Sequence, residues 1–223
     1  MERRHNYHDV EFVLRNPFTM TIAGPSKCGK TTLVEKIIEN ANWFYSEKPN
    51  KFFYFYNEMK PIDKHSTIHQ NVEEFFNGTP SMEWLKDIYY QYGENVTIII
   101  DDQDLNLTKD IATIFNVGSH HMYANVIYIT HNIFGKQKEA RDMSLNCDYF
   151  VLCKQVRDQA QIRNFFTQNQ PRKFKAALNA YNEATNAPYS YFWIDLHQET
   201  PDHLRFLSNV FSENGNPPHV FVL

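Results

Sequence analysis

A short segment near the start of the chain constrains the fold more than any other. Residues 24–31 read GPSKCGKT and fully match the pattern G-x-x-x-x-G-K-[S/T], a loop whose backbone N–H groups converge on phosphate oxygens. In this pattern Gly24 and Gly29 permit the backbone path, Lys30 reaches the β- and γ-phosphates as a positive charge, and Thr31 offers a hydroxyl to Mg²⁺. The segment therefore predicts a site for a nucleoside triphosphate.

The residues on both sides of this segment support the prediction. Residues 18–23 are apolar and β-branched, as in a strand, and in residues 32–38 Leu33 and Ile37 fall on one helical face. A strand, a loop and a helix whose N-terminus faces the anion form the arrangement that phosphate binding requires. We expect ATP to be held by Gly24, Pro25, Ser26, Lys27, Cys28, Gly29, Lys30, Thr31 and Thr32.

Length and composition favour one domain. The chain has 223 residues, of which 42% are hydrophobic and 15% aromatic, enough for a substantial core. We predict an extension over residues 1–15, an ATPase domain over residues 16–212 and a tail over residues 213–223. The net charge of −4 argues against a uniformly basic surface but leaves room for a locally basic face.

The cysteines and the start of the chain favour a reducing compartment. Three cysteines cannot all pair within one chain, and no apolar stretch follows the charged residues at the start. The longest apolar runs are far shorter than the ~20 residues needed to cross a bilayer. We therefore predict a protein that is not secreted and has no membrane span.

A second chemical landmark follows a β-branched run. Residues 96–102 read VTIIIDD, which is typical of a buried central strand that delivers its acids where open α/β sheets bind ligands. Asp101 is predicted to hold Mg²⁺, and Asp102 to orient and deprotonate the attacking water. By themselves the acids could equally begin a turn, but the phosphate-binding loop favours catalysis. Asp104 is predicted to cap a helix over residues 105–117.

A polar pair follows the next predicted strand, residues 125–130. In P-loop ATPases with additional strands, a polar residue at this position contacts the γ-phosphate or the attacking water. Asn132 is our first candidate for this sensor and His131 the second, although Asn132 could instead satisfy a turn.

Strands are further predicted over residues 52–56, 149–153 and 191–195, and helices over residues 82–92, 155–169 and 171–184. The aromatic run at residues 52–56 is interpreted as core rather than as a base-stacking surface. Alternating strands and helices predict an α/β fold of three layers, the P-loop NTPase fold with a mainly parallel sheet of the RecA/FtsK/HerA type.

The order of further motifs is more specific than the loop alone. The chain resembles the DNA-packaging ATPases of Maverick/Polinton elements and adintoviruses, which are similar to poxvirus-type and virophage packaging ATPases of the FtsK/HerA superfamily. The resemblance spans residues 16–211 and is carried by GSHH at 118–121, VIYITHNIF at 126–134, SLN at 144–146, Arg157-Asp158, Ala184-Thr185, Pro188-Tyr189 and Asp195.

The resemblance implies a motor that hydrolyses ATP with Mg²⁺ and pulls double-stranded DNA into a preformed capsid. It further implies a ring homo-oligomer, a hexamer or pentamer, at a capsid vertex and in contact with capsid vertex proteins. Virion assembly sites in the host nucleus or cytoplasm are the corresponding location. In such a ring a cationic finger from one subunit can complete the neighbour's site.

The chain departs from the family pattern at three places, and one of them is Gln103-Asp104, which follows the acid pair where apolar residues are usual. His131 stands where family members commonly have Gln, and Met122 stands where many carry Arg or Lys, a candidate position for the finger. Arg141 and Arg157 are our substitutes for the finger. The pair at residues 120–121 lacks the spacing of zinc ligands, so a subunit-interface, phosphate-sensing or packing role remains open.

Two other functions remain open on sequence alone. A small-molecule or nucleotide kinase also carries this loop in a chain of similar length, but the acid pair and the polar pair favour water as the acceptor. A non-motor NTP-binding scaffold in capsid assembly would not need the intact residues Lys30, Thr31, Asp101 and Asp102.

Overall fold

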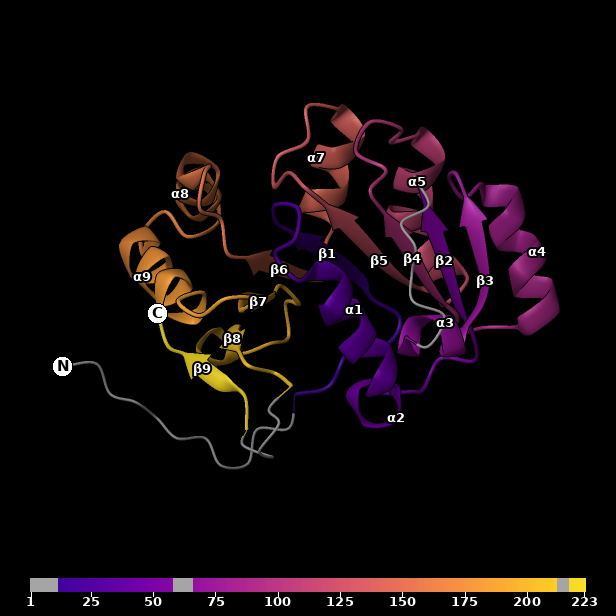
Figure 1. Cartoon of the computed structure of the whole chain (residues 1–223), viewed down its shortest axis with the longest axis horizontal. Coiled ribbons are helices and arrows are strands. Elements are labelled where there is room, and N and C mark those ends of the chain that lie inside the picture. Colours follow the sequence, from indigo (N-terminus) through magenta and orange to yellow (C-terminus); the bar gives the residue numbers. More distant parts are fainter. Residues whose placement is uncertain (1–11, 58–65, 212–216) are drawn as a thin grey trace.

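The β-branched runs form the centre of a single sheet (Figure 1). The computed structural model describes residues 12–57, 66–211 and 217–223. Within these ranges nine strands lie in the order β3-β2-β4-β5-β1-β6-β7-β8-β9. The parallel strands are β1 (Thr19–Ala23), β2 (Phe52–Tyr56), β3 (Val72–Asn77), β4 (Thr97–Asp101), β5 (Asn125–Thr130) and β6 (Tyr149–Cys153). The antiparallel strands are β7 (Tyr191–Asp195), β8 (Phe206–Ser208) and β9 (His219–Phe221).

Alternate residues of each central strand serve two different cores, one on each face of the sheet. In β4, Ile98 and Ile100 belong to one hydrophobic cluster and Ile99 to the other, as the two-residue period of a strand requires. The Ile99 face is covered by α1 (Lys30–Glu39), α2 (Ala41–Phe44) and α3 (Thr67–Asn71).

The other face carries most of the remaining helices. They are α4 (Met82–Tyr92), α5 (Lys109–Thr113), a π-helix (Ile114–Gly118), α6 (Ser119–His121), α7 (Lys138–Leu145), α8 (Gln159–Asn169) and α9 (Phe174–Ala184), and a 3₁₀ turn (Asp202–Leu204) precedes β8. In Figure 1, α4 lies at the β3 end of the sheet, and α8 and α9 lie at the β7–β9 end. The three layers and the mainly parallel sheet confirm the predicted α/β class.

Several predicted boundaries are wrong, and one residue has a different role. Asp104 is not a helix cap, because α5 begins later and its cap is Thr108, whose hydroxyl accepts from the Ile111 N–H at 3.3 Å. Asp104 instead accepts from the Tyr128 hydroxyl at 2.9 Å. The predicted helix 105–117 is thus a loop, then α5, then the π-helix.

Helices α8 and α9 begin four and three residues later than predicted, at Gln159 and Phe174. Asp158 accepts from the Gln161 N–H at 3.2 Å and so fixes the start of α8.

The short strands β3, β8 and β9 were not predicted. Strand β3 reads VEEFFN, which lacks a clear apolar run, and β8 and β9 have only three residues each. Residues 219–221 lie within the predicted tail and pair with β8. Residues 1–11 of the predicted extension lie outside the described residues, and the division into extension, domain and tail stays a prediction.

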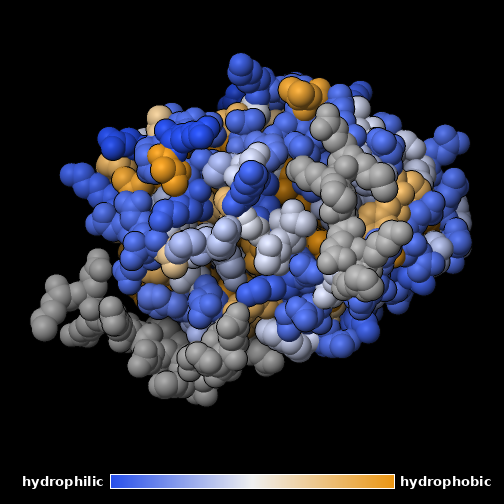
Figure 2. Space-filling view, viewed as in Figure 1, coloured by the Kyte–Doolittle hydropathy of each residue, from blue (hydrophilic) through white to orange (hydrophobic). Residues whose placement is uncertain are grey.

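The face of the molecule shown in Figure 2 is largely hydrophilic. Large hydrophobic side chains such as Tyr90 and Leu105 are also exposed. Among the described residues, each helix is too short or too polar to span a membrane.

The end of β7 holds a buried carboxylate, Asp195, which is only 4% exposed. It accepts from the His197 backbone N–H at 3.0 Å, from His197 Nδ1 at 2.8 Å and from the Thr200 hydroxyl at 2.8 Å. Burial raises the pKa of this carboxyl, but the hydrogen bonds from His197 and Thr200 outweigh burial and hold its pKa below the usual value.

This geometry predicts how Asp195→Asn changes stability with pH. A carboxyl with a lowered pKa in the folded state stabilises the fold above its unfolded pKa of ~3.9, and this contribution is lost as the pH falls through the folded pKa. The variant should therefore unfold more easily than the wild type at neutral pH, and this difference should shrink below about pH 4. Urea unfolding at several pH values measures it.

Asp202→Asn is the matched control, because Asp202 pairs with Arg205 at 2.9 Å but is 89% exposed. It should change the free energy of unfolding little at any pH. An equal loss of stability for Asp195→Asn at neutral and acidic pH would contradict the assignment.

Candidate functional site

The phosphate-binding loop lies where the sequence predicts it, between β1 and α1. The Gly24 N–H donates to the Thr130 carbonyl at 3.2 Å, which ties the start of the loop to β5. Gly29 has a φ of 101°, a left-handed value, and its carbonyl accepts the first helical hydrogen bond from the Leu33 N–H at 2.9 Å. The loop therefore leads directly into the N-terminus of α1, as the pattern requires.

Gly24 is needed because two side chains crowd it. A Cβ placed on Gly24 would lie 2.6 Å from the Cβ of Cys153 and 2.7 Å from the Sγ of Cys28. At the other end of the loop, a Cβ on Gly29 would lie 3.4 Å from the Cβ of Tyr189. A side chain at Gly24 would therefore clash, whereas at Gly29 the contacts are ordinary and the left-handed φ is what favours glycine.

Lys30 is the buried cation of the site. Lys30 is only 7% exposed, and its ammonium donates to the carbonyls of Gly24 at 2.6 Å and Pro25 at 2.9 Å. The same ammonium lies 3.3 Å from Nδ1 of His131. Lys30 therefore connects the loop to the end of β5.

His131 extends this connection to the acid pair. Its Nε2 lies 3.1 Å from Oδ1 of Asp102. Because an ammonium can only donate, Nδ1 accepts from Lys30 and the proton on Nε2 faces Asp102. The path Lys30–His131–Asp102 joins the loop, the end of β5 and the end of β4, and we name it the bridging path.

The backbone around the bridging path is fixed by neighbouring groups. Asp102 has a φ of 57°, a left-handed value that turns the chain directly after β4. The His131 N–H donates to Asp104 at 2.9 Å, and Asp104 also accepts from the Tyr128 hydroxyl at 2.9 Å. Asp104 therefore positions His131, a role that its place in the sequence did not reveal.

Asp101 is held from the other side, by β2. The Tyr54 hydroxyl donates to its Oδ2 at 2.8 Å. Burial raises the pKa of Tyr54 far above its usual value, so the phenol stays protonated and remains a donor. Thr31 lies in the first turn of α1, directly after the loop, and Asp101 ends β4; both offer oxygen ligands, the donor type that Mg²⁺ prefers. The donor chemistry of this pair suits the predicted metal, and its metal-binding role stays a prediction.

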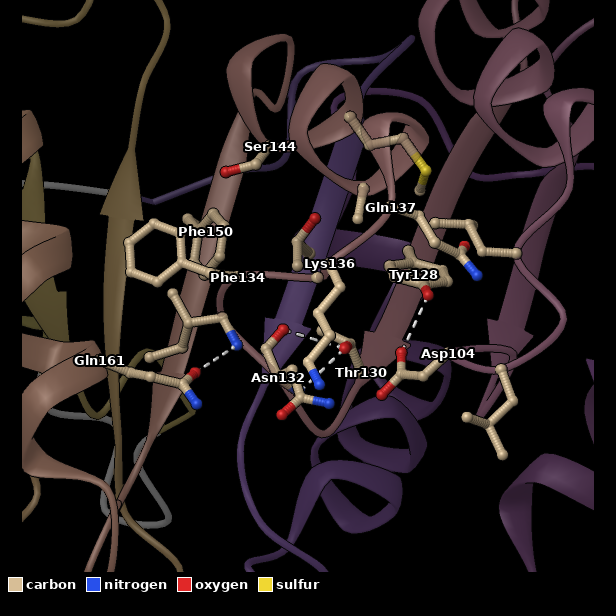
Figure 3. Close-up of a pocket in the computed structure, with 17 residues that line it drawn as sticks. Asp104, Tyr128, Thr130, Asn132, Phe134, Lys136, Gln137, Ser144, Phe150 and Gln161 are labelled. Atoms are coloured by element: carbon tan, nitrogen blue, oxygen red, sulfur yellow. Dashed lines mark hydrogen bonds between the residues drawn. The ribbon is translucent and has the colours of Figure 1, made fainter.

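Of the two sensor candidates, His131 contacts Lys30 and Asp102, whereas Asn132 is exposed and makes different contacts. The Asn132 N–H donates to the Thr130 hydroxyl at 3.0 Å, and its side chain lines a cavity of about 470 Å³. Figure 3 shows Lys136 beside Asn132 in this cavity and Gln161 on its far wall. The geometry thus favours the second sequence candidate over the first, and the sensor role stays a prediction for both.

The two predicted finger residues lie at the surface of the chain. Arg141 on α7 and Arg157 after β6 are both exposed. Met122 follows α6 and precedes β5, so it lies at the amino end of the parallel strands, opposite the loop. The exposed residues His120 and His121 lie at that same end. The finger assignments remain predictions.

Comparison with known proteins shows the fold. No protein-family model and no curated protein sequence matches the chain. The genome packaging NTPase B204 of Sulfolobus turreted icosahedral virus 2, in complex with sulfate, matches with a TM-score of 0.57 and 12% identity over 82% of this chain and 93% of that chain. Its complex with ATP-gammaS matches with a TM-score of 0.54 and 14% identity over 82% and 94%.

B204 from Sulfolobus turreted icosahedral virus, a DNA-packaging ATPase, matches with a TM-score of 0.57 and 11% identity over 82% of this chain and 94% of that chain. At such identities the likeness shows that this chain has the same fold over most of its length.

The crowding at Gly24 predicts the effect of Gly24→Ala. The new methyl group must displace the loop, so we expect about tenfold weaker binding of ATP-gammaS or more, a loss of about 1.4 kcal/mol. Isothermal titration calorimetry measures the affinity, and the melting temperature shows whether the fold survives.

Gly93→Ala is the control. Gly93 has a φ of 76° and open space around its Cα, so the variant should lose stability through backbone strain yet bind as the wild type does. Unchanged affinity in Gly24→Ala would show that the loop is not confined as the contacts indicate.

Proposed function

We propose that this protein is an ATP-hydrolysing motor that moves double-stranded viral DNA into a preformed capsid. The observation that carries the proposal is the bridging path, which brings the buried loop lysine and the acid pair together at the carboxyl edge of the sheet. The fold supports it, since solved structures that share the fold include a genome packaging NTPase in complex with ATP-gammaS.

The loop and the carboxyl edge of the sheet have different roles in binding the nucleotide and its metal. The N–H groups of residues 26–32 and the Lys30 ammonium hold the phosphates, because the loop leads into the N-terminus of α1. Thr31 and Asp101 hold Mg²⁺, which neutralises charge on the phosphate oxygens when bound. Tyr54 keeps the Asp101 carboxylate in one orientation through its 2.8 Å hydrogen bond.

Asp102 accepts the proton of the attacking water. His131 orients this carboxylate through the Nε2 contact of 3.1 Å, and its Nδ1 contacts Lys30. When a triphosphate binds Lys30, the contact between the Lys30 ammonium and Nδ1 of His131 changes. The imidazole ring transmits this change to Asp102 through its Nε2 contact. His131 thus takes the sensor role in this chain, coupling occupation of the loop to the catalytic acid.

The motor acts as a ring, a hexamer or pentamer, at a capsid vertex where virions assemble. Arg141 and Arg157 are the candidates for the finger, because both are exposed and free to reach a neighbouring subunit's phosphates. The net charge of −4 is no obstacle, since contacts to DNA phosphates need only local positive charge.

One observation favours a second candidate function, a small-molecule or nucleotide kinase. The cavity of about 470 Å³ reaches Thr130 and Asn132 at the carboxyl edge and contains the polar side chains of Lys136 and Gln161. A kinase would bind its acceptor in such a cavity. The acid pair at the bridging path favours water, and the experiment below separates the two.

We predict that the purified protein hydrolyses ATP to ADP and phosphate without an added acceptor, and that double-stranded DNA increases the rate. Lys30→Ala removes the phosphate-binding charge and Asp102→Asn the base, so each should lower kcat by about 100-fold or more. A coupled phosphate-release assay measures these rates.

Asp110→Asn is a matched control, because Asp110 is an exposed acid on α5. It should keep the wild-type rate. Turnover only with a small acceptor molecule would favour the kinase, and binding of ATP without any turnover would favour a non-motor scaffold.

We further predict that Tyr54→Phe raises the Mg²⁺ concentration needed for half-maximal hydrolysis by about tenfold, because groups that orient a metal ligand tune metal affinity. The assay is a Mg²⁺ titration of the initial rate at saturating ATP.

Tyr128→Phe removes a hydrogen bond of similar length, 2.9 Å, from Asp104 rather than from Asp101. Its Mg²⁺ requirement should match the wild type. Equal shifts in the two variants would indicate a general loss of stability instead of a specific effect on the metal ligand.

A further inference from the structure

Two cysteines from distant parts of the chain meet beneath the phosphate-binding loop. Cys28 belongs to the loop and Cys153 ends β6, and both are free thiols. Their sulfurs lie 2.7 Å and 3.4 Å from the same point, the position that a Cβ on Gly24 would occupy. The absent side chain of Gly24 is what lets the two thiols approach each other.

The two thiols have different chemical environments. Interaction with the Cys153 thiol is the largest influence on Cys28 and lowers its pKa to about 7, with burial opposing and the Lys30 charge assisting. The same interaction, together with burial, raises the pKa of Cys153 well above its usual value. Cys28 is thus the more readily ionised and partly accessible partner, and Cys153 is the buried thiol.

The third cysteine differs from this pair. Cys147 is buried, burial raises its pKa to about 12, and its sulfur donates to the Tyr149 carbonyl at 2.8 Å. A buried thiol with a raised pKa does not itself attack a peroxide. Cys147 therefore provides an internal comparison.

We propose that Cys28 and Cys153 form an oxidation site, at which a peroxide converts the two thiols into a disulfide that locks the phosphate-binding loop. The Cys28 thiolate attacks a peroxide oxygen, which gives a sulfenic acid and, for hydrogen peroxide, one water. The Cys153 sulfur then attacks the Cys28 sulfur, the S–S bond forms, and a second water leaves with the thiol proton. Two thiols are oxidised and one peroxide is reduced; a thiol reductant reverses the bridge.

The bridge restricts the segment that must wrap the phosphates. Cys28 is one residue before Gly29, whose φ of 101° directs the chain into α1. A covalent bond between Cys28 and Cys153, at the end of β6, restricts the movement of the loop. The loop N–H groups can then no longer adjust their positions to bind phosphate. Because the coupling is reciprocal, a bound nucleotide should in turn disfavour the disulfide. This consequence rests on the proposed function, whereas formation of the bridge does not.

The test treats the full-length protein with hydrogen peroxide, blocks the remaining thiols with iodoacetamide and identifies cross-linked peptides by mass spectrometry. We expect a peptide pair joining Cys28 to Cys153, at least tenfold weaker binding of ATP-gammaS, and recovery of both with dithiothreitol. Saturating ATP-gammaS before the peroxide should reduce the yield of the bridge.

Variants separate the pair from other effects of peroxide. Cys153→Ser removes the bridge, so peroxide should no longer give a change in affinity that dithiothreitol reverses. Cys147→Ser should behave as the wild type, and each variant is compared with its own reduced form. A bridge that is absent from the oxidised wild type, or one that forms without weakening ATP-gammaS binding, would overturn the proposal.

The outcomes also separate this proposal from the proposed function. Failure of the reduced protein to hydrolyse ATP contradicts the motor, while the cross-linked peptide and the binding of ATP-gammaS still test the oxidation site. A reduced protein that hydrolyses ATP but never forms the bridge contradicts only the oxidation site.

Discussion

The bridging path from Lys30 through His131 to Asp102 is the interaction on which the rest of the site depends. It joins three segments that are distant in the sequence, and its contacts of 3.3 Å and 3.1 Å use both ring nitrogens of one histidine. The path exists because β1, β5 and β4 are neighbouring parallel strands whose carboxyl ends meet at one edge of the sheet. A residue at the end of the middle strand can therefore reach both neighbours.

The fold holds that edge in place from two sides. Strands β4 and β5 are buried on both faces, and their alternate side chains enter separate cores, which fixes the register of each strand against its neighbour. Register decides function here, because Asp101 lies opposite Ile129 and a slip of one residue would turn the acids to the wrong face. Tyr54 then fixes the Asp101 side chain, and Asp104 fixes the His131 backbone, each by a hydrogen bond.

Much of the fold was predictable because its signals are local. The loop motif, the apolar runs of β1, β2, β4, β5, β6 and β7, and α4 follow directly from residue periodicity. The structure also links Lys30 to Asp102 through His131, and the catalytic roles of these residues stay predictions. What could not be predicted depends on contacts between distant segments. The sequence predicts Asp104 as a helix cap, but in the fold this carboxylate accepts hydrogen bonds from Tyr128 and His131. Cys28 and Cys153 lie 125 positions apart, and only the close approach at Gly24 brings them together.

The central claim, that this site drives movement along double-stranded DNA, is tested most directly by a triplex-displacement assay. A fluorescent third strand is annealed to a DNA duplex, and its release is followed after addition of protein and ATP. The account predicts release that requires ATP hydrolysis, that is absent with ATP-gammaS and that is later when the duplex ahead of the triplex is longer. ATP hydrolysis at full rate on this duplex with no release of the third strand would contradict it.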